Sequence, residues 1–149
     1  MSERKQNKKI DKRAPVIVGV GDLVDRSKED GLNPQELLAK ACEHAIQDSG
    51  IKELNKHIDY VGVVRFTVDF LTATNQSNFQ YSNFPRTLAN KLNVSAKNEV
   101  YAPMGGNSPQ VLLEDALVKI SSGETDCALL SGGEALQTMI AKLLSLIHI

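Results

Sequence analysis

The stretch Met104-Gly105-Gly106-Asn107-Ser108-Pro109 matters most for interpreting this sequence, because it joins a predicted strand to a predicted helix. Residues 98–102 have the pattern of a short strand, and apolar positions recur at helical spacing from Pro109 to Gly123. The two glycines let the backbone approach another molecule closely. Free N–H groups at a helix start favour a carbonyl oxygen, a carboxylate or a phosphate. The pattern predicts a ligand-facing turn; a capped turn without a ligand is the alternative.

Strands and helices alternate on both sides of this turn. β-Branched and apolar runs predict the strands, and apolar residues at helical spacing predict the helices. We expect strands at 16–21, 58–66, 98–102 and 126–133, helices at 33–50, 81–92, 108–123 and from 134 onward, and loops at 22–31 and 67–80. This alternation indicates an α/β fold with a mostly parallel sheet covered by helices. The run Val16–Gly21 is typical of a strand buried on both faces.

The helix expected after residue 32 carries clear boundary signals. Asn33 is a suitable N-cap, Glu36 stands where a capping box requires it, and Gly50 is placed to end the helix. Cys42 lies within the apolar stripe of this helix, and Cys127 lies within a predicted strand. Both cysteines are therefore expected to be small core residues.

Composition narrows the class of protein. The chain has 149 residues, 42% of them hydrophobic, which fits one globular domain. The net charge of −1 gives no electrostatic reason to expect nucleic acid or an anionic membrane. No run reaches the roughly eighteen apolar residues of a membrane helix. Two distant cysteines and three scattered histidines match neither a disulfide framework nor a metal site, so we expect a cytoplasmic protein without a metal.

The two ends of the chain differ from the rest. Residues 1–13 are rich in Lys and Arg and are expected to form a basic disordered tail, with a targeting arm or a polyanion contact as alternatives. Residues 144–149 match the translation of a common sequencing adapter, so we expect a non-native tail there; a genuine apolar tail is the alternative. The folded domain is then expected to span residues 14–143.

A second glycine pattern, Gly19-x-Gly21, follows the first predicted strand. It suggests a dinucleotide-binding turn only weakly. The third glycine of that motif would fall at Val24, and the residues that follow have a loop-like composition instead of a helix start. A tight strand end is the simpler interpretation.

Three motifs together resemble the nucleophile region of the thiolase superfamily. They read Gly105-Gly106-Asn107-Ser108-Pro109-Gln110-Val111, then Ile120-Ser121-Ser122-Gly123-Glu124-Thr125-Asp126, then Leu130-Ser131-Gly132-Gly133-Glu134-Ala135. The family has Cys-Gly-Ser-Gly-x-Gln-Ala, Ile-x-x-Gly-x-x-Asp and Ala-Gly-Gly-x-Glu at these places. The first predicted strand and helix are similar as well, so the resemblance covers residues 14–142. It implies a thiolase-like fold, of which this chain would be the amino-terminal first half.

The resemblance also shows a departure. Alignment on Gln110 puts Gly105 at the nucleophile position, and glycine cannot form the acyl-enzyme that cysteine forms. Neither cysteine of the chain falls there. Ser108 is a weak candidate nucleophile, and a helix-capping role is its alternative. The chain is most similar to a thiolase-like subgroup, often labelled acetyl-CoA acetyltransferase, that carries a Gly-Gly-Asn-Ser/Thr-Pro-Gln turn.

The resemblance implies a function in lipid metabolism, with a coenzyme A thioester as substrate and no other cofactor. An acyltransferase is the first expectation, although no residue of this chain is assigned a catalytic role. A non-catalytic subunit that binds acyl-CoA or lipid beside a partner protein is the second, and a ligand-free dimer partner the third. The substrate-binding residues would be Gly105, Gly106, Asn107 and Ser108. The family's remaining catalytic His and Cys belong to its carboxyl-terminal half, and the full-length form is expected to be a homodimer.

Overall fold

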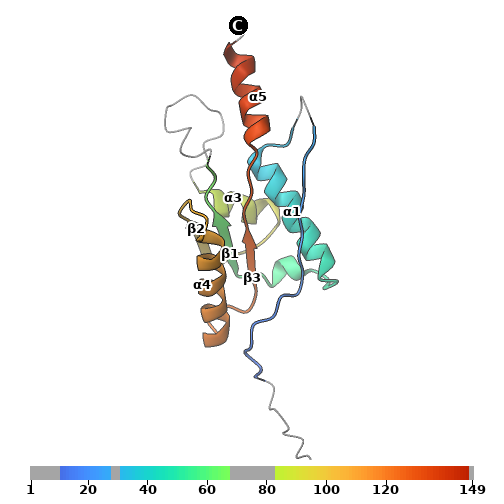
Figure 1. Ribbon diagram of the computed structural model, residues 1–149. Coiled ribbons are helices and arrows are strands. Elements are labelled where there is room, and N and C mark those ends of the chain that lie inside the picture. The colour runs from blue at the N-terminus through green and yellow to red at the C-terminus, as the bar shows by residue number, and fades with distance from the viewer. Residues whose placement is uncertain (1–10, 28–30, 68–82, 148–149) are drawn as a thin grey trace, which may run out of the picture.

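The computed structural model describes residues 11–27, 31–67 and 83–147. Its elements are α1 (Pro34–Asp48), the 3-10 helix η1 (Leu54–Lys56), β1 (Tyr60–Val64), α3 (Phe84–Lys91), β2 (Asn98–Ala102), α4 (Ser108–Ser122), β3 (Ala128–Ser131) and α5 (Leu136–Ile147). The strands form one parallel sheet in the order β2-β1-β3 (Figure 1). The expected α/β fold with a parallel sheet is therefore confirmed.

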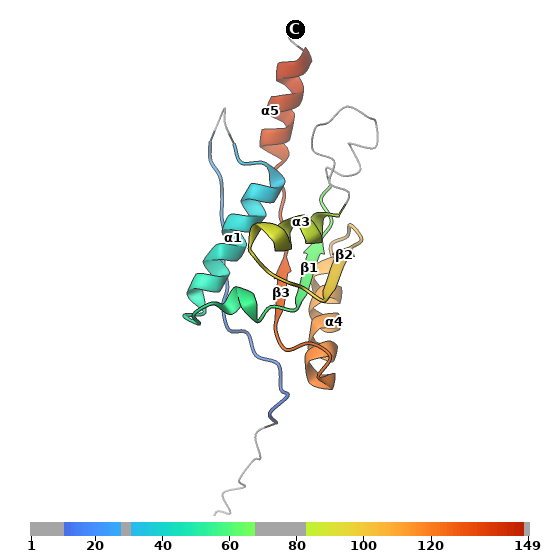
Figure 2. The same ribbon diagram turned by 180° about the vertical axis from the view of Figure 1, so that it is seen from behind.

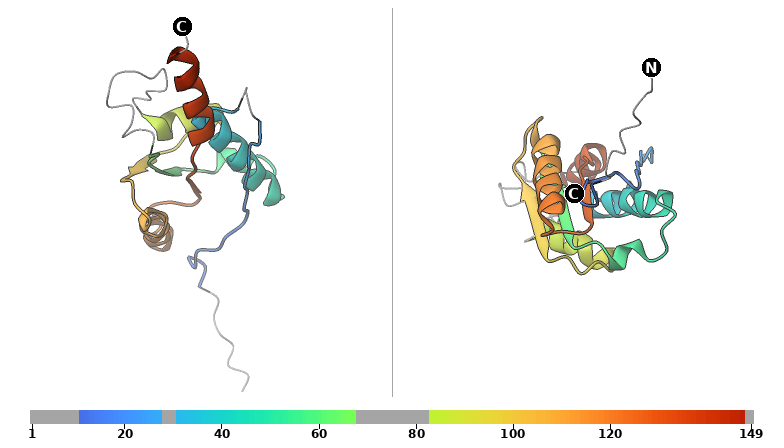
Figure 3. Two further views of the ribbon diagram at one scale, coloured as in Figure 1. Left: turned by 45° about the horizontal axis from the view of Figure 1, so that its top comes forward. Right: turned by 90° about the horizontal axis from the view of Figure 1, so that it is seen from below.

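The helices cover the sheet on two faces. α1 and α3 pack on one face, and α4 packs against all three strands on the other (Figure 2). The view from below in Figure 3 shows α4 separated by the strands from α3. The buried Tyr60 links its strand to α4, because its hydroxyl donates a 2.7 Å hydrogen bond to Asp115 Oδ2. The outer side of α4 carries exposed apolar residues, including Val111 and Val118.

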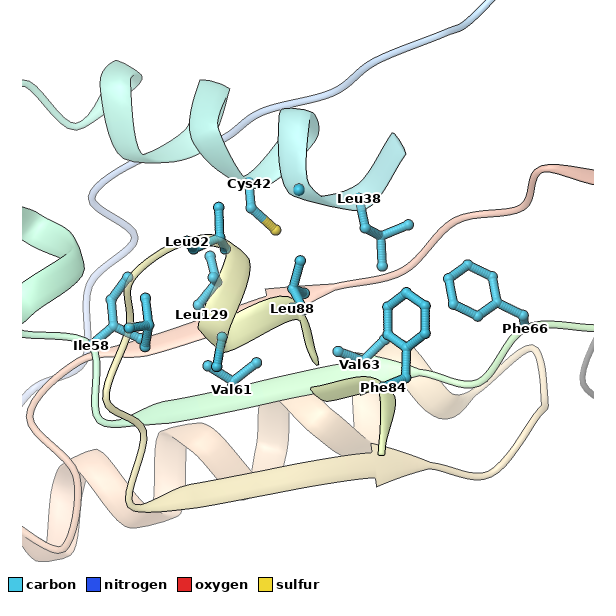
Figure 4. Packing of buried hydrophobic residues seen from close by; sticks show 13 residues of the cluster. Leu38, Cys42, Ile58, Val61, Val63, Phe66, Phe84, Leu88, Leu92 and Leu129 are labelled. Carbon is cyan, nitrogen blue, oxygen red and sulfur yellow. The ribbon is translucent and has the colours of Figure 1, made fainter. Parts of the chain in front are cut away.

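The hydrophobic core lies between the sheet and the layer of α1 and α3 (Figure 4). α1 contributes Leu38 and Cys42, β1 contributes Val61 and Val63, and α3 contributes Leu88 among others. Each of these side chains is at most 3% exposed. The expectation that Cys42 is a small core residue is confirmed, and the half-buried Cys127 packs against the same cluster.

The helix boundaries follow from the signals in the sequence. The Asn33 side chain accepts the Glu36 N–H and the Glu36 side chain accepts the Asn33 N–H, so the capping box at the start of α1 is complete. α4 ends at Ser122 and is capped by Gly123, whose φ of +81° is the left-handed conformation that glycine adopts at little cost. α5 continues to Ile147, and the predicted domain limit at residue 143 stays a prediction.

The predicted first strand at Val16–Gly21 is wrong. This segment, called the strap below (residues 14–22), has no strand pairing in the described part of the chain (Figure 1), and Val16 and Ile17 are 76% and 79% exposed. The Val20 N–H donates to Asp48 Oδ2 of α1 at 2.9 Å, where a strand would donate to a neighbouring carbonyl. The strap is therefore held by a helix and not by the sheet.

Smaller corrections concern element ends and burial. α3 begins at Phe84 after the N-cap Asn83, later than expected, and α5 begins at Leu136. β3 is only partly buried, because it is the last strand at its edge of the sheet in the described residues; of its members only Leu129 is buried. The loop predicted at 67–80 lies almost wholly outside the described residues. None of the described helices is long and apolar enough to cross a membrane.

Candidate functional site

The candidate site lies at the carboxyl edge of the sheet, where β2 ends and α4 begins. The connection is short: β2 ends at Ala102 and α4 starts at Ser108, so the turn 103–107 stands above the strand ends (Figure 1). Ligands of open parallel sheets bind at this edge. The predicted ligand-facing turn is therefore at a suitable place in the fold.

Hydrogen bonds inside the turn use only part of its polar groups. The Ser108 N–H donates to the Gly105 carbonyl at 3.0 Å, and the Ser108 hydroxyl donates to the Pro103 carbonyl at 2.6 Å. Within the described residues, the N–H groups of Gly105, Gly106, Asn107 and Gln110 have no hydrogen-bond partner. The positive end of the α4 dipole adds to these donors, so the turn favours an oxygen atom with negative character.

Ser108 has a different role from the one that a binding or nucleophilic serine would need. It is 3% exposed, and its hydroxyl proton is engaged by Pro103. The N-cap residue is Asn107, whose side chain makes no capping hydrogen bond, and Ser108 is the first helical residue. The expectation that Ser108 caps α4 is corrected: its hydroxyl closes the turn backward onto residue 103.

Neither glycine of the turn is required by the local backbone. Gly105 and Gly106 do not have positive φ values, the conformation that most strongly favours glycine. A Cβ at Gly106 would meet nothing within 4 Å, and one at Gly105 would meet only Asn107 Oδ1 at 3.2 Å and Ser108 Oγ at 3.4 Å. A side chain therefore has space at Gly106, whereas at Gly105 it would require a small shift of Asn107.

A cleft of about 470 Å³ adjoins this turn. Its walls come from the end of β1 at Val64 and Arg65, from Pro109 and Leu112 of α4, and from residues 130–134. Because Pro109 lines the cleft and directly follows Ser108, the cleft and the turn share the first turn of α4. Most of the lining residues are apolar or glycine, which suits an uncharged portion of a ligand.

Two charged residues border the cleft. Glu134 Oε1 accepts the Thr67 N–H at 2.7 Å and so ties the chain after β1 to the chain after β3. The Arg65 guanidinium lies 4.6 Å from the ring centroid of Tyr101, which packs against the core cluster on the α1 and α3 face. The positive charge of Arg65 is thus held over Tyr101, on the face opposite α4.

The two cysteines are unsuited to act at this site. Burial raises the pKa of the Cys42 thiol to about 11, and the neighbouring Ser131 hydroxyl offsets only part of this effect. Burial, with a contribution from Asp59, also raises the pKa of Cys127. Cys127 precedes β3 and so lies at the amino ends of the strands, whereas the cleft lies at their carboxyl ends. A thiolate, the nucleophilic form of cysteine, is disfavoured at both positions.

The structure brings Gly105, Gly106 and Asn107 together as an exposed turn and buries Ser108 beneath it. Whether they bind a substrate stays a prediction. Sequence reasoning did not identify Val64, Leu130 or Glu134 as lining residues. A general rule could have found two of them. Ligands bind at the carboxyl ends of parallel strands, and Val64 and Leu130 lie at or near such ends.

Comparisons with known proteins identify the class of fold. The parallel sheet with its helices is a thiolase-like α/β fold, because it superposes on a solved thiolase-like structure with a TM-score of 0.68. That structure is described as a monomeric SCP2-thiolase like protein type 1 from Mycobacterium smegmatis. The two sequences are 31% identical over 84% of this chain. The chain spans 24% of the length of the matched protein. A scan of protein-family models gives no match, and a search of curated proteins gives none.

Proposed function

We propose that this protein binds coenzyme A thioesters at the start of α4, with the thioester carbonyl directed at the turn Gly105–Asn107. The observation that carries the proposal is the open space at Gly106, next to N–H groups that have no partner in the described residues. Preorganised N–H groups of this kind polarise a carbonyl and stabilise negative charge on its oxygen. The likeness to an SCP2-thiolase like protein supports the same ligand class.

The proposed activity is acyl transfer or another reaction of the thioester, in lipid metabolism. No described residue at the turn supplies a nucleophile: position 105 is glycine, and the Ser108 hydroxyl is buried. Condensation or hydrolysis without an acyl-enzyme is therefore more consistent with the turn than ping-pong thiolysis. In either reaction, the N–H groups would hold the carbonyl oxygen while another group delivers the proton or the nucleophile.

The second candidate is a non-catalytic subunit that holds acyl-CoA or lipid for a partner protein. The glycine at position 105 favours it, because binding needs the open turn but not a nucleophile. The homodimer that the sequence resemblance implies stays a prediction, since the matched structure is described as monomeric.

Calorimetric titration with acetyl-CoA tests the binding step. Gly106→Leu should fill the open space and weaken binding about tenfold or more, equivalent to about 1.4 kcal/mol. Ser121→Leu is the matched control, because it adds the same side chain at an exposed position near the other end of α4. Equal affinities of the two variants would contradict the proposed site.

Incubation with acetyl-CoA and acetoacetyl-CoA separates the two candidates. Turnover that survives alkylation of both cysteines supports an enzyme that does not use a thiol. Tight binding without turnover supports the non-catalytic subunit. Loss of turnover in proportion to alkylation of Cys127 would contradict the proposed site, because Cys127 lies at the amino ends of the strands and the cleft lies at their carboxyl ends.

A further inference from the structure

The cleft beside the turn carries one side chain that readily accepts a proton, that of Glu134. Glu134 lies in the segment between β3 and α5, which rises from the carboxyl end of β3 (Figure 1). The other polar side chains among the described residues that line the cleft are Arg65 and Ser131. An arginine stays protonated, and a serine hydroxyl is a far weaker base than a carboxylate.

The two oxygens of the Glu134 carboxylate have different surroundings. Oε1 accepts the Thr67 N–H at 2.7 Å, and this hydrogen bond orients the carboxylate. Oε2 has no hydrogen-bond or ion-pair partner among the described residues, and Glu134 is exposed, so water reaches this oxygen. The Arg65 guanidinium lies instead 4.6 Å from the ring centroid of Tyr101. No cation of the described chain therefore competes with water for Oε2.

Glu134 and the proposed carbonyl site lie on two sides of one cleft. Pro109 and Leu112 bring the start of α4 to it, and residues 130–134 bring the segment that follows β3. The cleft volume of about 470 Å³ is many times the share of one water molecule in the liquid, about 30 Å³, so a short acyl group and a water molecule fit together. The N–H groups of the turn then hold the carbonyl oxygen from the α4 side, and water at Glu134 approaches from the β3 side.

We propose that Glu134 is the general base of a thioester hydrolase. Its Oε2 takes a proton from water while the water oxygen forms a bond to the thioester carbonyl carbon. The carbon–sulfur bond then breaks, and the proton passes from Glu134 to the sulfur of coenzyme A. The products are a carboxylic acid and free coenzyme A, and no acyl-enzyme forms. This inference rests on the proposed function.

Glu134→Gln tests this assignment, because the amide oxygen still accepts the Thr67 N–H but the amide takes up no proton. The kcat for release of acetate from acetyl-CoA should fall about a hundredfold or more, within the usual contribution of a general base. The affinity for acetyl-CoA, measured by calorimetry, should stay unchanged because the turn is intact. Glu114→Gln is the matched control: it removes the same charge from an exposed position of α4 and should retain the parent kcat. Equal kcat values in the two variants would overturn the inference.

The unmodified 149-residue chain gives a second test that does not depend on the folding of a variant. NMR of the reaction mixture should show acetate as the product. Acetoacetyl-CoA in place of acetate would show condensation and would overturn the inference. The rate should be lower in D₂O than in H₂O, because a proton of water moves to Glu134 in the reaction. Equal rates in the two solvents would contradict that proton transfer.

The outcomes separate this inference from the proposed function. Binding of acetyl-CoA without release of acetate contradicts the hydrolase but leaves the thioester site in place. Release of acetate that is as fast in Glu134→Gln as in the parent contradicts only the role of Glu134. Absence of acetyl-CoA binding by the unmodified chain contradicts both.

Discussion

The chain has two pairs of glycines whose surroundings differ: Gly19 and Gly21 in the strap, and Gly105 and Gly106 in the turn before α4. A Cβ at Gly19 would lie 2.2 Å from the Ala45 carbonyl oxygen, and a Cβ at Gly21 would lie 2.3 Å from the Ala41 carbonyl oxygen. At Gly106 a Cβ would meet nothing within 4 Å. Gly19 and Gly21 allow the strap to lie directly on the backbone of α1, whereas Gly106 leaves space that no described part of the chain fills.

This difference separates a structural glycine from one that suits a ligand site. Gly19-x-Gly21 resembles a phosphate-binding turn in sequence, but its glycines are accounted for by contact with a helix backbone. Gly106 contacts nothing within the described fold that would require a glycine, and Gly105 approaches only side-chain atoms of its own turn. Space at a helix start, beside a cleft, is the arrangement that a bound carbonyl or anion uses.

The largest expected effect is the loss of stability in Gly21→Ala. The added methyl group would overlap main-chain atoms of α1, which cannot rotate away, so the strap must move off the helix. We expect the free energy of unfolding to fall by about 1–3 kcal/mol, the usual cost of overpacking. Urea unfolding of the variant and of Gly106→Ala measures the contrast; equal stabilities would show that the strap does not pack as described.

A second expected effect concerns acid and the loop between the strap and α1. Backbone hydrogen bonds, first that of Leu32, lower the pKa of Asp25 to about 2 from its ordinary value of 3.8. Because the folded-state pKa is the lower one, the charged carboxylate stabilises the fold above about pH 4, and this contribution is lost as the pH falls toward 2. The Leu32 amide signal in NMR should titrate near pH 2; a midpoint near 3.8 would contradict the hydrogen bond.

The smallest expected effect is that of Gly106→Ala on stability. The alanine has space and no positive φ to oppose it, so the variant should be as stable as the parent or more stable by about 0.4–1 kcal/mol. The gain comes from the reduced freedom of the unfolded chain. Thermal unfolding measures it, and a loss above about 1 kcal/mol would show that Gly106 is a structural glycine like Gly21.

Local signals in the sequence predicted much of the fold. The capping box of Asn33 and Glu36 and the terminal Gly123 depend on residues within a few positions of each other, and the structure confirms both. The strap could not be predicted in the same way. A β-branched run forms a strand only where a neighbouring strand offers hydrogen bonds, and here Val20 pairs with the Asp48 side chain instead.

The candidate site was predicted only in part, for a similar reason. The turn 104–109 is contiguous, so its pattern is visible in the sequence. The cleft beside it needs Val64, Leu112 and Leu130, which come from three separate elements and meet only in the folded chain. The burial of Ser108 likewise depends on the fold, since serines at helix starts are commonly exposed caps.

The variant Gly105→Cys measures whether the start of α4 holds a thioester carbonyl. The new Cβ would lie 3.2 Å from Asn107 Oδ1, so the Asn107 side chain must shift by a few tenths of an ångström to accept it. The thiol would then lie at a helix N-terminus, where its pKa is lowered. Its thiolate would attack the carbonyl carbon of acetyl-CoA, the carbon–sulfur bond to coenzyme A would break, and coenzyme A would leave as a thiolate that takes up a proton. Ser121→Cys, at the other end of α4, is the matched control.

Mass spectrometry of the intact variants after incubation with acetyl-CoA follows this reaction. If the start of α4 holds the carbonyl, the introduced thiol at position 105 should gain one acetyl group about tenfold faster or more than the thiol at position 121, with Cys42 and Cys127 unmodified. Equal rates at positions 105 and 121, or no acetylation at position 105 in a folded variant, would contradict the account.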